Sequence, residues 1–197
     1  MSRAVFARFV WLGALIALSG CSTPPQAPPR VDPPILVAQP LTDFTLEGRL
    51  SLRARDEAVS GGLRWSRQGM RDHMLVTTPM GGAVAEITRV GEHIEVVDHK
   101  GQRTVTESGL SGLDQVLGFK LPLDHLSWWL AGTGREGEVS RREYNSEGRL
   151  AHLEQDGWQI DFQRYQPVAD RFLPGKLVAR RGEDLELRLV VDQWTLP

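Results

Sequence analysis

In the stretch FTLEGRLSLR, residues 44–53, apolar residues alternate with polar ones. Phe44, Leu46, Leu50 and Leu52 fall on one side of an extended chain, and charged side chains fall on the other. A two-residue period is typical of an antiparallel strand with one face on the core and one face in water. The stretch therefore predicts a sheet with one buried face.

Further strands follow along the chain, separated by short turn sequences. Gly61-Gly62 is interpreted as a break before the second strand, and Leu173-Pro174-Gly175 as an interruption later on, because glycine and proline disfavour strand interiors. Asp156-Gly157 is a strong hairpin signal. The predicted strands cover residues 63–67, 73–78, 83–90, 93–98, 102–106, 150–155, a return strand from Trp158, 176–181 and 185–191.

Helical spacing appears in the middle of the chain. Ser111 and Asp114 have the spacing of a capping box, and Gly118 is a suitable end for the helix that follows. A second helix is predicted from near Pro122 to Gly132. The predicted inward faces carry Leu113, Val116 and Leu117 in the first helix and Leu123, Leu126, Trp129 and Leu130 in the second, with Trp128 partly exposed.

About ten strands and two helices make a mainly β fold of the α+β class. The simplest arrangement is a single curved antiparallel sheet with the helices against its concave side, closed or nearly closed. Cys21 is the only cysteine, so no disulfide holds this fold. The chain of 197 residues is nevertheless long enough to form a core of its own.

Residues 1–20 have the features of a secretory signal: Arg3 and Arg8 accompany an apolar run that is too short to span a membrane. Leu18-Ser19-Gly20-Cys21 resembles the lipobox of bacterial lipoproteins, whose cysteine is acylated and becomes the first residue of the mature protein. By the same resemblance, Ser22 implies export to the outer membrane. The alternative is a signal cut elsewhere, with Cys21 as a stray cysteine.

A proline-rich linker follows the predicted anchor. Seven of the 12 prolines of the chain lie between residues 22 and 40. Such a segment is extended and, at about 3.1 Å per residue, reaches about 60 Å. A recognition motif for another protein is the alternative to a plain spacer. The predicted organisation is therefore a signal peptide at 1–20, the lipid-anchored cysteine and linker at 21–40, and one domain at 41–197.

Composition and motifs give no indication of catalysis or nucleic-acid binding. Loss of residues 1–20 removes two arginines and no acidic residue, so the formal net charge goes from −2 to −4, and a nucleic-acid-binding surface would be basic. The five histidines lack metal-site spacing, and Asp98-His99 and Asp124-His125 are interpreted as solvated turn residues. The expectation is a protein that is not an enzyme and has no metal or cofactor.

One apolar residue stands in an unusual place. Thr77-Thr78-Pro79-Met80-Gly81-Gly82 joins two predicted strands, and Met80 occupies the tip of this loop. Such a residue either folds back into the core or is offered to something outside. A membrane-tethered domain favours the second role, since a flexible thioether side chain adapts readily to apolar surroundings.

Several separated motifs together resemble the LolB family of outer-membrane lipoprotein receptors, from about Leu41 to Pro197. Their order and spacing carry the resemblance more than any one of them does. The motifs are Phe44 to Leu50, Pro79-Met80-Gly81, Leu121-Pro122-Leu123 through Trp129 to Gly132, Gln155-Asp156-Gly157-Trp158, Leu173-Pro174 and Asp192-Gln193-Trp194.

The resemblance implies an unclosed β-barrel with a helical lid over an apolar cavity. It implies a monomer, anchored by lipid to the periplasmic face of the outer membrane of a Gram-negative bacterium. The implied function is to accept triacylated lipoproteins from the periplasmic carrier LolA and to insert them among outer-membrane phospholipids without nucleotide. In the family the loop commonly carries Leu between Pro and Gly, so Met80, with Pro79 and Gly81, takes the membrane-insertion role here.

The candidate cavity lining combines inward residues of the predicted strands and helices. The alternative is that the same side chains pack against each other as a solid core. A solid core would favour a structural or assembly lipoprotein that binds another protein through its sheet, and a cleft with paired carboxylates would favour an envelope hydrolase. The candidates are Leu50, Leu52, Leu63, Trp65, Leu113, Val116, Leu126, Trp129, Trp158, Ile160, Leu187 and Leu189.

Cys21→Ala tests the anchor. Loss of the thiol removes the acylation site, so we expect a soluble periplasmic protein that still binds acylated cargo. Membrane fractionation and a cargo-binding assay measure the two properties separately. Loss of cargo binding by this variant would show that the anchor does more than localise the protein.

Overall fold

The computed structural model of the chain describes residues 39–55, 57–117, 119–135 and 139–197. The predicted signal peptide, Cys21, the linker up to residue 38 and Gly118 lie outside the described residues. The described part holds eleven strands and two helices: β1 (Asp43–Ala54), β2 (Glu57–Gln68), β3 (Arg71–Thr77), β4 (Ala83–Val90), β5 (His93–Asp98), β6 (Arg103–Thr106), α1 (Gly109–Leu117), α2 (Leu123–Leu130), β7 (Val139–Tyr144), β8 (Leu150–Gln155), β9 (Trp158–Val168), β10 (Arg171–Arg181) and β11 (Leu185–Thr195).

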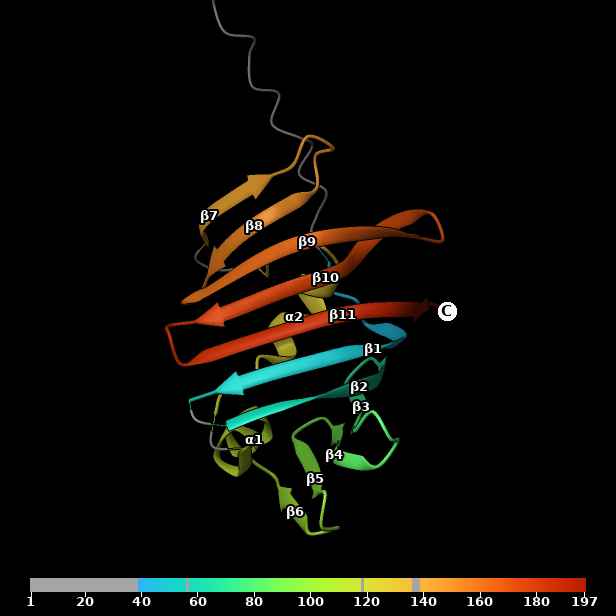
Figure 1. Cartoon of the computed structure of the whole chain (residues 1–197), viewed down its shortest axis with the longest axis vertical. Coiled ribbons are helices and arrows are strands. Elements are labelled where there is room, and N and C mark those ends of the chain that lie inside the picture. Colours follow the sequence, from blue (N-terminus) through green and yellow to red (C-terminus); the bar gives the residue numbers. More distant parts are fainter. Residues whose placement is uncertain (1–38, 56, 118, 136–138) are drawn as a thin grey trace, which may run out of the picture. The chain divides into compact units, whose positions relative to one another are not determined.

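All eleven strands form one antiparallel sheet in the order β6-β5-β4-β3-β2-β1-β11-β10-β9-β8-β7 (Figure 1). The first described strand, β1, lies at the centre of the sheet, and the chain runs outward from it by hairpins to the edge strand β6. It then passes through α1 and α2 to the opposite edge strand β7 and returns by hairpins to β11. This order confirms the single antiparallel sheet, and its two free edges leave the barrel unclosed.

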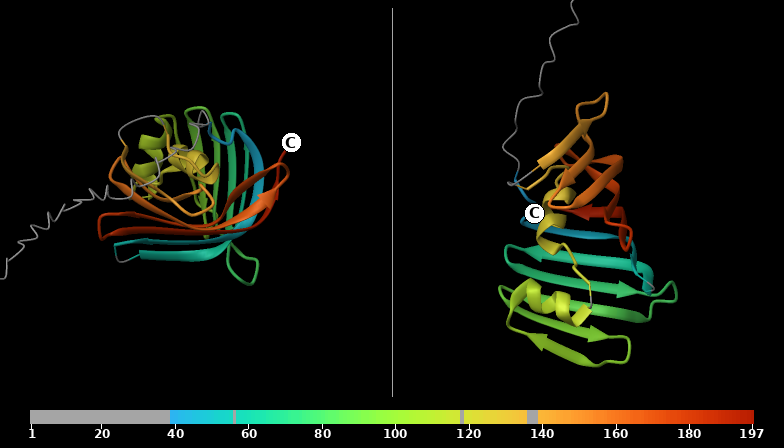
Figure 2. Two further views of the ribbon diagram at one scale, coloured as in Figure 1. Left: turned by 90° about the horizontal axis from the view of Figure 1, so that it is seen from above. Right: turned by 90° about the vertical axis from the view of Figure 1, so that its left-hand side faces the viewer.

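The sheet curls around the two helices, which lie on its concave side (Figure 2). Helix α1 contacts β5 and β6, and α2 contacts β10. The helices therefore cover the inner face in the region between the two edge strands. This arrangement confirms the expectation of helices against a concave sheet.

Large aromatic side chains form the centre of the core. Trp65, Trp129 and Trp158 are almost fully buried. The rings of Trp129 on α2 and Trp158 on β9 meet edge to face at 5.5 Å between centroids, a favourable aromatic geometry. Trp128 is only partly buried, which confirms the predicted orientation of α2.

Strands β2 and β10 extend well beyond their predicted ranges, because residues that usually break strands lie inside them. Gly61 and Gly62 are part of β2, where a Cβ on Gly61 would lie 1.9 Å from the Thr77 carbonyl oxygen. Glycine is thus required there by a close backbone approach. Pro174 lies inside β10 at a shift of register, a position that tolerates the missing N–H.

The predicted capping box is wrong. Helix α1 begins at Gly109, so Ser111 lies inside it, and its hydroxyl donates to the Ser108 carbonyl at 2.7 Å. The Asp114 carboxylate instead accepts the Leu121 N–H at 3.1 Å, which fixes the connection to α2. Burial raises the pKa of Asp114, and this hydrogen bond opposes the shift.

The neighbouring glycines of β2 give a paired stability test. Gly61→Ala forces a methyl group against the backbone of Thr77. In Gly62→Ala the new methyl group lies 2.8 Å from the Thr77 hydroxyl alone, and this hydroxyl can rotate away. We expect Gly61→Ala to lower the free energy of unfolding by about 1–3 kcal/mol and Gly62→Ala to lower it clearly less. Urea denaturation measures both, and equal losses would contradict the close approach.

Candidate functional site

The interior face brings the predicted lining residues together from both halves of the sheet and from both helices. Ten of the twelve are less than 9% exposed, Leu50 is partly buried, and Val116 is 37% exposed. Val116 therefore lies outside the sealed interior, unlike Leu113 on the same helix. The packed state of the ten shows that the apolar interior is covered by α1 and α2; their role as a lining stays a prediction.

The indole N–H of Trp129 is buried without a hydrogen-bond partner among the described residues. A buried donor left in this state costs about 1–3 kcal/mol. The centre of the interior thus holds an unused donor next to apolar side chains.

A charged cluster is buried on the same inner face, where apolar residues were expected. Asp72 on β3 stands opposite Arg67 on β2 and Arg89 on β4. Its carboxylate accepts from Arg67 Nε at 2.6 Å and from Trp65 Nε1 at 2.9 Å. All three charged residues are less than 9% exposed. Through these hydrogen bonds and ion pairs the cluster links the three adjacent strands β2, β3 and β4.

Helix α2 is held from both sides by consecutive residues. Arg89 Nη1 on β4 donates to Asp124 Oδ1 at 2.8 Å. His125 Nε2 lies 3.0 Å from Asp156 Oδ2 in the β8–β9 turn. The interpretation of Asp124 and His125 as solvated turn residues is therefore wrong, because they bridge the two halves of the sheet through the helix.

The structure supports the prediction that Asp98 is a turn residue. The Asp98 carboxylate accepts the N–H groups of Lys100 and Gln102, both at 2.8 Å, in the β5–β6 turn. The bond from Gln102 is the main reason that the pKa of Asp98 is lowered. Asp98 is thus a turn residue, as expected.

The loop between β3 and β4 projects from the convex side of the sheet, away from the helices (Figure 2). The Thr78 N–H donates to the Gly82 carbonyl at 2.7 Å, and the Gly81 N–H donates to the Thr78 carbonyl at 2.9 Å. These bonds make a tight turn that presents Met80, which is 95% exposed. The exposure excludes the alternative in which Met80 packs into the core.

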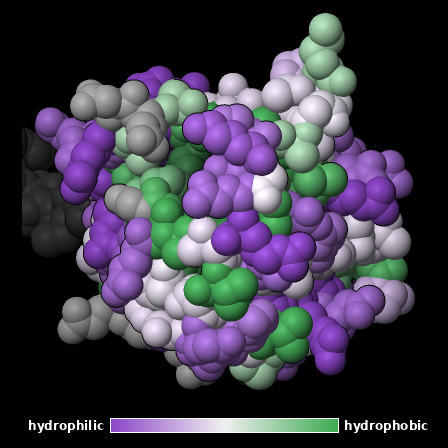
Figure 3. All heavy atoms as spheres, turned by 90° about the horizontal axis from the view of Figure 1, so that it is seen from below, coloured by the Kyte–Doolittle hydropathy of each residue, from purple (hydrophilic) through white to green (hydrophobic). Residues whose placement is uncertain are grey.

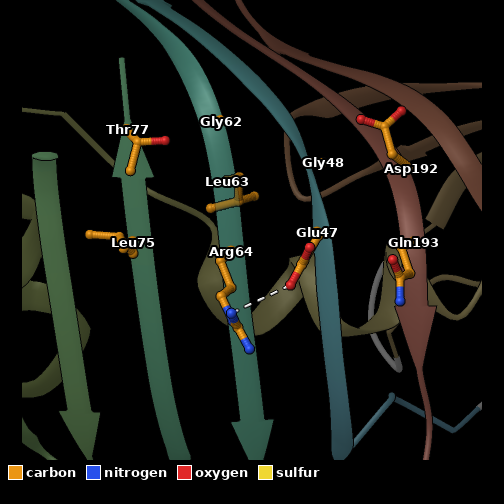
Figure 4. Close-up of a pocket in the computed structure, with 9 residues that line it drawn as sticks. All are labelled: Glu47, Gly48, Gly62, Leu63, Arg64, Leu75, Thr77, Asp192 and Gln193. Carbon is orange, nitrogen blue, oxygen red and sulfur yellow. Dashed lines mark ion pairs between the residues drawn. The ribbon is translucent and has the colours of Figure 1, made fainter. Parts of the chain in front are cut away.

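Two hollows lie on the convex face, and the sequence did not reveal them. The first, of about 440 Å³, is lined by residues of β1, β2, β3 and β11, among them the ion pair between Glu47 and Arg64 at 3.5 Å (Figure 4). The second, of about 650 Å³, lies at the base of the β3–β4 loop. Gly62 and Thr77 line both, so the two hollows adjoin.

The surface at the β6 end of the domain mixes hydrophilic and hydrophobic groups (Figure 3). A recess in the upper part of this view has hydrophobic groups at its floor. Among the described residues, no helix combines the length and apolar character that crossing a membrane requires.

The missed cluster had a signal in the sequence. Arg67 is in phase with Leu63 and Trp65 on β2, and Asp72 is in phase with Met74 on β3. Alternation alone therefore points these charges inward. The hollows had no such signal, since they depend on which strands become neighbours.

Comparison with known proteins gives a consistent family match. A family model described as "Outer membrane lipoprotein LolB" matches residues 42–194. The outer-membrane lipoprotein LolB of Nitrosomonas europaea is 33% identical over 193 residues, covering 93% of this chain and 90% of its own length. The LolB of Thiobacillus denitrificans is 36% identical, covering 97% and 96%.

The fold has a counterpart among solved structures. A DUF1329 family protein from Desulfovibrio piger superimposes with a TM-score of 0.51 at 11% sequence identity. The superposition covers 79% of this chain and 85% of that protein. At this level of identity the similarity concerns the fold alone.

Asp72→Asn tests the buried cluster. The change keeps the shape but leaves Arg67 and Arg89 without their shared charge, so we expect the free energy of unfolding to fall by about 3–5 kcal/mol. Asp192→Asn is the control, since its pair with Arg49 has side chains 51% and 67% exposed and contributes about 0–1 kcal/mol. Chemical denaturation compares them, and similar losses would refute the structural role of the cluster.

Proposed function

This chain belongs to the LolB family of outer-membrane lipoproteins, and on this premise we propose that it accepts acylated lipoproteins and inserts them into the outer membrane. The donor is a LolA-like periplasmic carrier, and the acyl chains occupy the apolar interior between the sheet and the helices. The role is non-enzymatic and uses no nucleotide. Acylated Cys21 and the linker up to residue 40 tether the domain at 41–197 to the membrane.

The exposed tip of the β3–β4 loop carries this proposal. Met80 is 95% exposed at the end of a hydrogen-bonded turn, so its flexible thioether side chain is free to adapt to an apolar partner outside the domain. The lipid bilayer supplies that partner for a tethered protein. Met80, flanked by Pro79 and Gly81, is therefore assigned to contact with the acceptor leaflet.

The sealed interior sets a condition on cargo entry. Ten candidate lining residues are buried, so an acyl chain enters only when the covering helices α1 and α2 move away from the sheet. Burial of one chain is worth on the order of 10 kcal/mol, at about 0.8 kcal/mol per methylene. The unused Trp129 donor supports an occupant that brings an acceptor, such as the ester carbonyl of an acyl group. Transfer then runs downhill from the carrier to this protein and on to the bilayer.

Met80→Glu separates acceptance from insertion. A charge at the loop tip opposes entry into the acyl region, so we expect the variant to take cargo from the carrier and fail to deposit it in liposomes. Met70→Glu is the matched control, because Met70 is 63% exposed in the β2–β3 turn. Cargo transfer from carrier to liposomes is followed by sedimentation. Normal deposition by Met80→Glu would return Met80 to a structural role.

A binding measurement tests the interior directly. We expect a fluorescent fatty-acid probe to bind the mature protein and to be displaced by a triacylated peptide. Binding to the Met80→Glu variant is expected to be unchanged, since the loop lies on the opposite face. Failure of the parent protein to bind the probe would favour the alternative of an assembly lipoprotein that binds another protein through its sheet.

A further inference from the structure

The larger convex hollow is built into the base of the β3–β4 loop. Thr78, Pro79 and Gly81 form one wall, and strands β1, β2, β10 and β11 form the rest. Its depth has a simple origin, because Gly62 on the outer face of β2 brings no side chain to this part of the sheet. Any surface that the loop tip enters must therefore also meet this hollow.

The height of the loop matches the thickness of a headgroup layer. Met80 lies three residues beyond Thr77 and three residues before Ala83, which limits its reach to at most about 10 Å. The polar region of one leaflet is roughly 5–8 Å thick. When Met80 reaches the acyl chains, the hollow lies among the phosphates.

The charges around the hollow suit an anion. Arg49, Lys176 and Arg188 line it, and no carboxylate does so among the described residues. Arg49 pairs with Asp192 and Arg188 pairs with Glu186, while Lys176 makes no ion pair within the part of the chain that the structure describes. Exposed ion pairs are weak in water, so a phosphate competes for these cations.

The rest of the lining suits the apolar part of the same molecule. Pro79 and Val190 line the hollow together with backbone of β2. A ligand for this site must therefore join an anionic group to an apolar one. Phospholipid has this composition, with its phosphate next to the glycerol and the first acyl methylenes.

We propose that this hollow binds the phosphate and glycerol of an anionic phospholipid in the acceptor leaflet, with Lys176 as the leading phosphate contact. The inference rests on the proposed function, since it takes the β3–β4 loop as the part that enters the bilayer. It adds a second membrane contact, selective for headgroup charge, beside the apolar contact of Met80.

Vesicle flotation of the mature chain, residues 21–197 with Cys21→Ala, tests the proposal. The vesicles are phosphatidylcholine alone or phosphatidylcholine with phosphatidylglycerol at a ratio of about three to one. Lys176→Gln is expected to weaken partition into the phosphatidylglycerol vesicles about five-fold and to leave partition into phosphatidylcholine unchanged. Adding Arg188→Gln to this variant is expected to weaken partition into the phosphatidylglycerol vesicles by a similar factor again. High salt is expected to abolish the differences between the variants and the parent protein.

Arg142→Gln is the matched control, because Arg142 is an exposed cation on the edge strand β7, four strands from β11. An equal loss for Arg142→Gln and Lys176→Gln would overturn the proposal in favour of general charge attraction. A loss for Lys176→Gln on both vesicle types would overturn it as well.

Met80→Glu distinguishes this inference from the proposed function. Suppose that Met80→Glu partitions weakly into both vesicle types and that Lys176→Gln partitions as well as the parent protein. This result would refute phospholipid binding by the hollow, and the assignment of the loop to the bilayer would stand. Normal cargo deposition by Met80→Glu would refute the loop assignment, whereas a phosphatidylglycerol-dependent effect of Lys176→Gln would still support the hollow.

Discussion

The pairing of the first strand with the last holds the molecule together. Ten residue pairs run from Thr45 opposite Thr195 to Ala54 opposite Leu185, with one irregularity between Glu47 and Gly48. Without them, the hairpins would give two separate sheets with unpaired edges. The pairing creates the continuous inner face that the helices cover. It also creates the convex surface on which both hollows lie.

Local signals were sufficient for much of the sheet. The strands at 83–90, 93–98 and 150–155 match the predictions at both ends, because each is set by its own alternation and by adjacent turn residues. The pairing of β1 with β11 joins segments more than 130 residues apart, and no local pattern encodes it. The predictions cut β2 and β10 short because Gly61 and Pro174 are explained only by contacts with other strands.

One candidate site residue could be singled out from the sequence. Met80 was identified because an apolar side chain at a loop tip is unusual; its exposure confirms its position at the tip, and its role in insertion stays a prediction. The charges of Arg67, Asp72 and Arg89 were missed because residue type was given more weight than strand phase. Buried charges in phase with apolar neighbours are informative, since they must be paired. The convex hollows could not be predicted before the order of strands was known.

The opposite placement of the interior and the loop constrains the proposed mechanism. Met80 lies on the convex side and cannot contact an acyl chain held on the concave side, so the proposed mechanism assigns it to the bilayer and not to the cargo. The helix α2 is held over the sheet mainly by its buried apolar side chains, among them Leu126, Trp129 and Leu130, each of which contributes about 1.5–3 kcal/mol. The pairs of Arg89 with Asp124 and of His125 with Asp156 add to this packing. Burial of one acyl chain, on the order of 10 kcal/mol, is of the same size, so in the proposed mechanism an incoming chain must replace the apolar contacts of α2 with its own.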